Sequence, residues 1–150
     1  EIALVLKQAA DMGFEPTWFG VDGMDGILSM EGFDTALAED AMLLTPFSAT
    51  AEDEKTQAFV AKYQELYGEI PNQFGADAYD GVYIIKAALE KAGATPDMEA
   101  SELCDALKTA MQEITFDGIT GKGITWEANG EPTKDPIAVQ IKNGVYEIME

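Results

Sequence analysis

The last third of the chain alternates turn signals with short β-prone segments, and this pattern constrains the fold more than any other feature. Asn129-Gly130 and Asn143-Gly144 are dipeptides that favour the tight turns of β-hairpins. Apolar and β-branched residues flank both turns, as they do in strands. The pattern predicts a short strand, a hairpin turn, a longer strand, a second tight turn and a final antiparallel strand.

The first third alternates helix and strand signals. Residues 1–12 carry apolar side chains on one helical face and are followed by Gly13, which predicts an amphipathic helix that ends there. Residues 17–21 are aromatic and β-branched, which suits a buried strand. After a loop rich in Gly and Asp, a helix is expected over about residues 25–37 and a strand over residues 41–45.

The middle of the chain is predicted to be helical. Thr50, with an acidic residue three positions later, is typical of a helix N-cap, and the helix it starts would end near Gly68. A longer helix is expected over about residues 72–92, with a glycine directly after its end. Thr95-Pro96 suits the N-cap and first position of a third helix. A single alternating α/β domain would continue its strands here, so the helical middle indicates a chain that crosses between two lobes.

The charge balance argues against nucleic acid as a partner. The 150 residues include 28 acidic and 9 basic side chains, for a net charge of −19. Binding to phosphates needs clustered Lys and Arg that displace counterions, and an anionic membrane surface would repel this chain.

Several kinds of reactive site are excluded by residue type and spacing. The chain has no histidine and one cysteine, so the Ser-His-Asp and Cys-His arrangements and the usual zinc sites cannot form. Cys104 lies among apolar residues and is expected to be a small core residue. Residues 22–31 lack two of the oxygen ligands of an EF-hand, and the glycines from Gly20 to Gly26 lack dinucleotide-loop spacing. We therefore expect no metal, no cofactor and no catalytic nucleophile.

Three segments, in this order and spacing, carry a family likeness. The first, residues 16–23, combines a strand with an acidic loop. The second, residues 67–81, contains Tyr-Gly-x-Ile-Pro and Tyr-Asp motifs, and the third is the tail from Phe116, with its aromatic-x-Gly-x-Thr-Gly motif. Together they resemble the type I periplasmic binding proteins, and more narrowly the branched-chain amino acid (Leu/Ile/Val-type) substrate-binding proteins of ABC importers.

The resemblance implies an α/β fold of periplasmic-binding-protein type I, with two Rossmann-like lobes that close on a ligand. By similarity, residues 1–48 form an α/β part of the second lobe. Residues 49–128 would return to the first lobe as a helical part, and residues 129–150 would return to the second lobe as strands. The likeness covers the later half of such proteins, and residues 1–12 form a helix with no strand before it. We therefore expect an incomplete C-terminal fragment.

Asp22 is the first candidate for a ligand-binding residue. The ammonium group of a free amino acid needs a carboxylate at hydrogen-bond distance to offset its desolvation. In open α/β sheets such a group lies just past the carboxyl end of a strand, and Asp22 follows residues 17–21 directly. The resemblance places the ammonium-binding acid of the family in this loop, although the best-known amino acid binders carry Glu there. The alternative is an Asp-Gly turn that caps the next helix.

Further candidates follow from the resemblance. Phe74 matches an aromatic residue that packs on the ligand side chain, with ordinary packing in the first turn of a helix as the alternative. Tyr79 either faces the cleft or lies in the core with its hydroxyl satisfied. Asp77 is a further cleft candidate. Asp80 is expected at the helix surface or in interlobe hydrogen bonds, with a cleft role as the alternative.

The resemblance implies an extracytoplasmic carrier, in the periplasm or as a cell-surface lipoprotein. It would bind an amino acid or similar small solute by hinge closure and dock on the membrane permease of an ABC importer. One alternative is a ligand-sensing receptor or regulator of the same fold. A second is a hydrolytic enzyme with paired carboxylates such as Asp77 and Asp80. Exposed edges of incomplete sheets would also permit oligomers.

Overall fold

The structure, a computed structural model, describes residues 1–149, which form two compact units. Unit 1 consists of Glu1–Gln73 together with the C-terminal segment from Pro136, and unit 2 consists of Phe74–Asp135. The lobe boundaries expected at residues 48 and 128 stay a prediction about the whole protein, and Glu150 lies outside the described residues.

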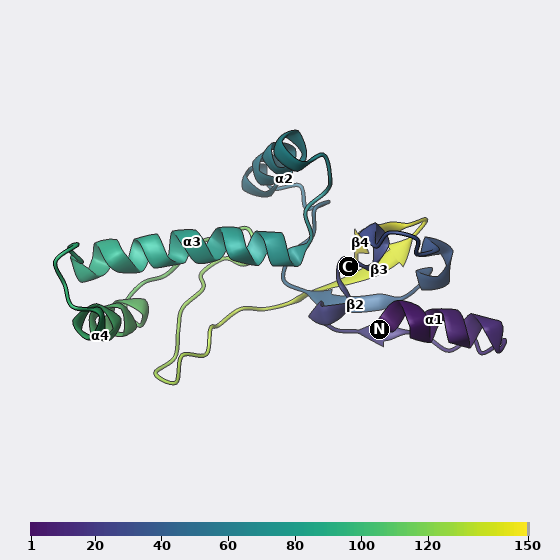
Figure 1. Cartoon of the computed structure of the whole chain (residues 1–150), viewed down its shortest axis with the longest axis horizontal. Helices are drawn as coiled ribbons and strands as arrows, with labels where there is room; N and C mark the ends of the chain where they lie inside the picture. Colours follow the sequence, from purple (N-terminus) through teal and green to yellow (C-terminus); the bar gives the residue numbers. More distant parts are fainter. Residues whose placement is uncertain (150) are drawn as a thin grey trace. The chain divides into compact units, whose positions relative to one another are not determined.

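A four-stranded mixed sheet forms the centre of unit 1 (Figure 1). Its order is β1 (Phe19–Gly20), β2 (Met42–Thr45), β3 (Ile137–Lys142) and β4 (Val145–Ile148). β1 and β2 are parallel, whereas β2, β3 and β4 pair in antiparallel fashion. The strands expected near residues 41–45 and at the end of the chain are confirmed. The strand expected over residues 17–21 is shorter than predicted, and the prediction that it is buried is wrong, since Phe19 and Val21 are exposed.

The core of unit 1 lies between this sheet and α1 (Ile2–Asp11). The buried face of α1 contributes Ala3 and Leu6, and the sheet contributes Leu43, Val139 and other apolar side chains. Burying a leucine fully stabilises a fold by roughly 1.5–3 kcal/mol, so these contacts fix the helix on the sheet. The amphipathic helix predicted before Gly13 is confirmed.

The prediction of a helix over residues 25–37 is wrong. Three short 3₁₀ turns occupy this region instead: η1 (Asp22–Met24), η2 (Ile27–Ser29) and η3 (Thr35–Ala38). Gly26 has φ 85° and Gly32 has φ 75°, which are left-handed conformations that interrupt any helix. The Asp34 carboxylate then accepts a hydrogen bond from the Ala36 amide and starts the next turn.

The helix α2 (Glu54–Tyr67) begins later than expected. Its N-cap is Asp53, whose carboxylate accepts a hydrogen bond of 3.0 Å from the Thr56 amide. The prediction that Thr50 caps this helix is wrong, because the Thr50 hydroxyl bonds to the serine hydroxyl two residues earlier. The predicted end is confirmed at Gly68, which is left-handed with φ 76°.

Two helices, α3 (Gln73–Ala92) and α4 (Ala100–Met111), supply most of unit 2. α3 has the predicted length, and Gly93 follows it with φ 63°. The predicted cap at Thr95-Pro96 is wrong, because α4 begins after Glu99 and the proline lies in a turn before it. No helix within residues 1–149 is both long and apolar enough to cross a membrane.

Two large apolar side chains of α3 are exposed within the part of the chain that the structure describes. Val82 is 67% exposed and Ile85 is 55% exposed, whereas the buried side of the helix carries Ala76, Asp80 and Ala88. The sequence also predicted a buried Cys104, which is wrong because that residue is exposed. Apolar spacing thus located the helices but not the faces that this chain buries.

The two Asn-Gly turns differ in what they connect. Asn143 and Gly144 have φ 51° and 76°, the left-handed pair of a tight hairpin turn, and they join β3 to β4 as predicted. Asn129-Gly130 also forms a turn, but its flanks make only an isolated bridge between Trp126 and Pro132. The short strand expected before this turn is therefore not formed.

Candidate ligand-binding site

Asp22 lies in the loop at the carboxyl end of β1, as the first residue of η1. Its side chain is exposed, and its carboxylate forms no hydrogen bond or ion pair within the described part of the chain. Gly20 lets the Met24 side chain pack closely against the backbone, because a Cβ at position 20 would lie 2.6 Å from the Met24 sulfur. The buried Met24 side chain thereby fastens the loop to the core.

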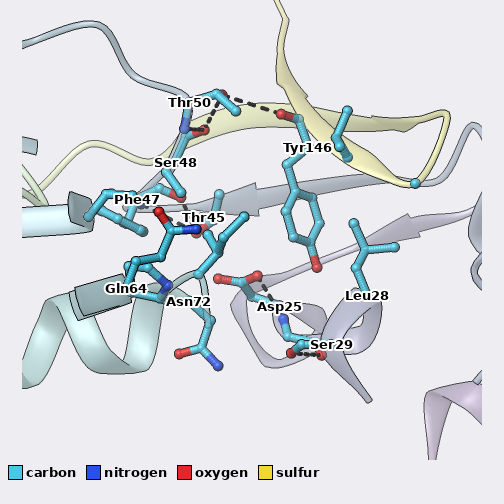
Figure 2. Close-up of a pocket in the computed structure, with 17 residues that line it drawn as sticks. Asp25, Leu28, Ser29, Thr45, Phe47, Ser48, Thr50, Gln64, Asn72 and Tyr146 are labelled. Carbon is cyan, nitrogen blue, oxygen red and sulfur yellow. Dashed lines mark hydrogen bonds between the residues drawn. The ribbon is translucent and has the colours of Figure 1, made fainter. Parts of the chain in front are cut away.

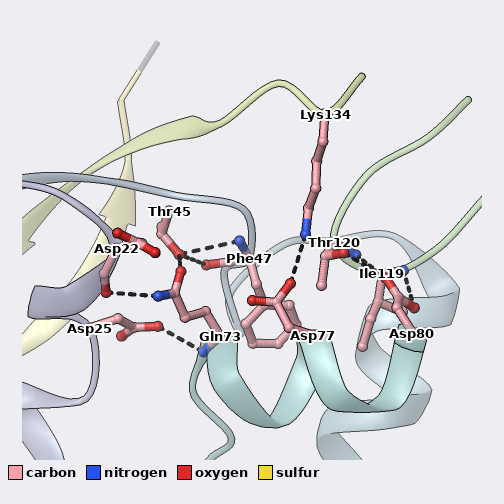
Figure 3. A network of polar contacts seen from close by, with 10 residues as sticks. All are labelled: Asp22, Asp25, Thr45, Phe47, Gln73, Asp77, Asp80, Ile119, Thr120 and Lys134. Atoms are coloured by element: carbon pink, nitrogen blue, oxygen red, sulfur yellow. Dashed lines mark hydrogen bonds and ion pairs between the residues drawn. The ribbon is translucent and has the colours of Figure 1, made fainter. Parts of the chain in front are cut away.

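Gln73 joins this loop to the end of β2 (Figure 3). Its side chain is only 1% exposed, and its amide Nε2 donates a hydrogen bond of 2.7 Å to the backbone carbonyl of Asp22. Its Oε1 accepts a hydrogen bond of 3.0 Å from the Thr45 hydroxyl. One buried amide therefore ties together two strand ends that are distant in sequence.

Asp25 has a different position in the same loop. Its carboxylate accepts hydrogen bonds of 2.7 Å from the Gly26 amide and 2.7 Å from the Gln73 amide at the start of α3. A negative charge is favourable there because a helix N-terminus carries partial positive charge. The Asp-Gly turn considered for Asp22 is thus formed by Asp25, which leaves the Asp22 carboxylate unused.

A pocket of about 290 Å³ in unit 1 opens beside Asp25 (Figure 2). Its walls are largely apolar and include Phe47, Val60, Ile70 and Tyr146, whereas Asp22 does not line it. The Tyr146 hydroxyl is buried without a hydrogen-bond partner in the described chain. Burial and the nearby Asp25 carboxylate raise the pKa of Tyr146 above its ordinary value, so the hydroxyl stays neutral. Asp25 is the charged side chain of this lining, and its carboxylate already accepts hydrogen bonds from the Gly26 and Gln73 amides.

The other three candidates lie on α3 in unit 2. Phe74 is in the first turn and is 51% exposed. The Tyr79 ring stacks at a tilt on Tyr83, with 4.9 Å between ring centroids, and a hydrogen bond with Tyr83 raises the pKa of Tyr79. Asp77 is paired with Lys134 at 2.7 Å. The ligand roles of Phe74, Asp77 and Tyr79 stay predictions.

Asp80 is neither at the surface nor open to a ligand. It is 2% exposed, and its carboxylate accepts hydrogen bonds from the Ile119 amide at 3.1 Å, the Thr120 amide at 2.8 Å and the Thr120 hydroxyl at 2.7 Å (Figure 3). A Cβ on Gly118 would lie 2.1 Å from this carboxylate, so that position requires glycine. The Tyr-Asp motif and the Phe-x-Gly-x-Thr-Gly motif are therefore joined by buried hydrogen bonds within unit 2.

These contacts bear on the acidic pair considered for hydrolysis. The Asp80 carboxylate is saturated by backbone and hydroxyl donors, and Asp77 holds a lysine. Among residues 1–149, no group of three or more Cys, Asp and Glu side chains comes together as a metal site would require. Gln73 and Thr45 are the residues near Asp22 that no sequence pattern indicated, since their contacts span 51 and 28 positions.

The comparisons with known proteins identify the family. The family model described as periplasmic binding protein matches residues 1–145. This chain belongs to the periplasmic binding protein family. The resemblance read from the three sequence segments is confirmed, as is the α/β fold of type I.

Several solved structures superimpose on nearly the whole chain. A leucine-binding protein, LivK of Thermotoga maritima, is 25% identical with a TM-score of 0.79, over 99% of this chain and 41% of its own. LivJ of Streptococcus pneumoniae, a branched-chain amino acid transporter substrate-binding protein solved with isoleucine, is 27% identical with a TM-score of 0.79, over 98% and 41%. A solute-binding protein of R. palustris, solved with benzoate, shares the fold at 16% identity and a TM-score of 0.78, over 98% and 39%.

The chain spans about two fifths of the length of these structures. Comparison with curated protein sequences returned no match. The relatives that share the fold are solute-binding proteins of ABC transporters, and their ligands include amino acids and benzoate. The arrangement of this chain thus matches part of the fold of these proteins.

Proposed function

We propose that the protein containing this chain is the extracytoplasmic solute-binding component of an ABC importer and that its ligand is an amino acid with an aliphatic side chain. The observation that carries the proposal is the unused carboxylate of Asp22 at the carboxyl end of β1, on a loop that buried contacts hold in place. Solute capture of this kind makes or breaks no bond in the ligand.

The free carboxylate suits a ligand with a positive charge. A charge-assisted hydrogen bond between carboxylate and ammonium is short and strong, and it offsets the desolvation of both groups. The neighbouring Asp25 suits this purpose less well, because two backbone amides already donate hydrogen bonds to its carboxylate. LivK and LivJ, at 25% and 27% identity, are named for leucine and branched-chain amino acid binding, which supports an aliphatic amino acid as the ligand.

The remaining parts of the proposal concern the whole protein. We infer that the ligand is enclosed by hinge closure between two lobes and that the closed form docks on a membrane permease. Phe74 and Tyr79 would supply aromatic contacts to the ligand side chain. Within the sheet formed by residues 1–149, β1 is an edge strand and its Phe19 is 64% exposed, so this edge would also permit contacts with other chains.

The benzoate-bound relative raises a second ligand class, the aromatic acids. Such a ligand has a carboxylate but no ammonium group, so it would leave Asp22 without a partner and place two negative charges in one site. Like charges brought together in a poorly hydrated site cost free energy. The Asp22 carboxylate therefore favours an amino acid over an aromatic acid.

Titration calorimetry on the full-length protein tests the proposal with three ligands. Leucine carries the ammonium group, isocaproate is leucine without it, and benzoate represents the aromatic acids. We expect leucine or another aliphatic amino acid to bind at least about tenfold more tightly than its des-amino analogue, a difference of about 1.4 kcal/mol. Binding of benzoate or isocaproate that equals or exceeds that of every amino acid would refute the proposal.

A further inference from the structure

We propose that Gln73 is the positioning residue for Asp22: its buried side-chain amide holds the loop at the end of β1 in the conformation that presents the Asp22 carboxylate to an ammonium group. This inference rests on the proposed function, since it assigns Gln73 a part in the same site. Gln73 would not touch the ligand itself but would act through Asp22.

The backbone carbonyl of Asp22 has both of its acceptor directions occupied. The Asp25 amide donates to it at 2.9 Å within η1, and Gln73 Nε2 donates at 2.7 Å from across the fold. A carbonyl with two donors cannot rotate its peptide plane without breaking one of them. Gly23, which follows Asp22, is conformationally permissive and lies in open space, since a Cβ there would meet no atom within 4 Å. The hydrogen bond from Gln73 therefore restrains a segment that would otherwise be free to vary.

The other end of the Gln73 amide also has a hydrogen-bond partner. Its Oε1 lies 3.0 Å from the Thr45 hydroxyl, and Thr45 is only 3% exposed. This contact fixes which way the amide faces, because the oxygen must meet the hydroxyl proton and the nitrogen must meet the Asp22 carbonyl. The Thr45 hydroxyl has one proton and a second acceptor, the Phe47 carbonyl at 3.1 Å, so its hold on Gln73 is partial.

The chemistry of the position selects glutamine. A glutamate would face the Asp22 carbonyl with a second acceptor, and an asparagine is shorter by one methylene and could not span both partners. A leucine would fill the volume but would leave one acceptor direction of the Asp22 carbonyl without its donor, and the Thr45 hydroxyl would keep only the Phe47 carbonyl as its acceptor. The side chain is thus matched to its two partners in donor type, acceptor type and length.

The test measures discrimination between leucine and isocaproate, or the best amino acid and its des-amino analogue, in the full-length protein. We expect Gln73→Leu to lower the affinity for the amino acid about tenfold while the affinity for the des-amino analogue stays unchanged, because only the ammonium contact depends on Asp22. Thr45→Val, which removes the partial hold, should lower the same ratio about threefold and serves as a second variant if Gln73→Leu folds poorly. A general loss of structure would lower both affinities together.

Gln57→Leu is the matched control. Gln57 also donates from its side-chain amide to a backbone carbonyl, that of Ala51 at 2.6 Å, but it is exposed and does not contact the Asp22 loop. This variant should leave the affinity ratio at its original value. A ratio that falls as far in Gln57→Leu as in Gln73→Leu would overturn the inference.

A double-mutant cycle with Asp22→Asn separates this inference from the proposed function. If Gln73 acts through Asp22, the combined variant should discriminate no less than Asp22→Asn alone, because the contact is already lost. If Asp22→Asn leaves the ratio unchanged, the proposed function fails. If Asp22→Asn abolishes the discrimination and Gln73→Leu leaves it intact, the function stands and the positioning role is overturned.

Discussion

Asp22 in unit 1 and Asp80 in unit 2 are both acids of family-like motifs, yet their surroundings are opposite. Asp80 is buried and accepts three hydrogen bonds from the turn at Ile119 and Thr120. Asp22 is exposed, its backbone is fixed by Gln73, and its carboxylate has no partner within residues 1–149. A structural acid accepts hydrogen bonds from other groups of the fold, whereas an acid that binds a ligand must have acceptor oxygens that the fold leaves unpaired.

The largest expected effect concerns the buried acid. Asp80→Ala would leave two backbone amides and the Thr120 hydroxyl without an acceptor, so we expect the free energy of unfolding to fall by about 3 kcal/mol or more. Urea denaturation of the full-length protein measures this loss, and Asp80→Asn, which keeps one acceptor oxygen, should lose less. If Asp80→Ala lowers the free energy of unfolding by less than about 1 kcal/mol, the hydrogen bonds of Asp80 do not stabilise the fold as their geometry suggests.

The next effect concerns the free acid and affects binding instead of stability. Asp22→Asn should weaken amino acid binding about 100-fold, because the ammonium group loses its charged partner in a desolvated site. The melting temperature without ligand should stay within about 1 °C, since no internal contact of the carboxylate is lost. Calorimetry and thermal unfolding give the two quantities separately, and a large stability loss would contradict the contrast with Asp80.

Asp25 sharpens the comparison because it shares the loop with Asp22 but has the contacts of a structural acid. Asp25→Ala removes the acceptor for the Gly26 and Gln73 amides, so we expect the free energy of unfolding to fall by about 1–2 kcal/mol. The binding loss should be smaller than that of Asp22→Asn. The opposite order of binding losses would show that Asp25, not Asp22, meets the ammonium group.

The smallest effects concern Asp77, whose partner is Lys134. The pair is partly exposed, so Lys134→Ala should change the free energy of unfolding by no more than about 1 kcal/mol. Asp77→Ala should have a similar effect on stability. If Asp77 also contacts the ligand, Asp77→Ala alone will weaken amino acid binding, and equal affinities in the two variants would exclude that role.

Local chemistry made some elements predictable from sequence. Asn143-Gly144 specifies its hairpin through two left-handed residues, and Gly68 and Gly93 end their helices in the same conformation. The helix expected over residues 25–37 failed for a related reason, because Gly26 and its counterpart at position 32 adopt left-handed conformations inside it. The start of α2 was predicted too early, because Asp53 and not Thr50 accepts the capping hydrogen bond from the Thr56 amide.

The candidate site was predictable only in part. Asp22 could be proposed because its position after a strand is a local feature of the sequence. Its partner Gln73 could not, because a hydrogen bond across 51 residues leaves no periodicity or spacing to detect. The burial of Asp80 was not predicted for the same reason, since its hydrogen-bond donors lie about 40 residues away in the sequence. Sequence patterns locate acids near a site, but only tertiary contacts separate the engaged acids from the available one.

The close approach of Gly118 to the Asp80 carboxylate has a consequence for recombination among relatives. Any side chain at position 118 would collide with the acid at position 80, so the two positions must be exchanged as a pair. Consider a chimera that takes α3 from one parent and the turn at residues 118–120 from another. We expect it to fold only where both parents have the acid at position 80 and the glycine at position 118. Crossover points for engineered binding proteins therefore belong outside residues 80–120.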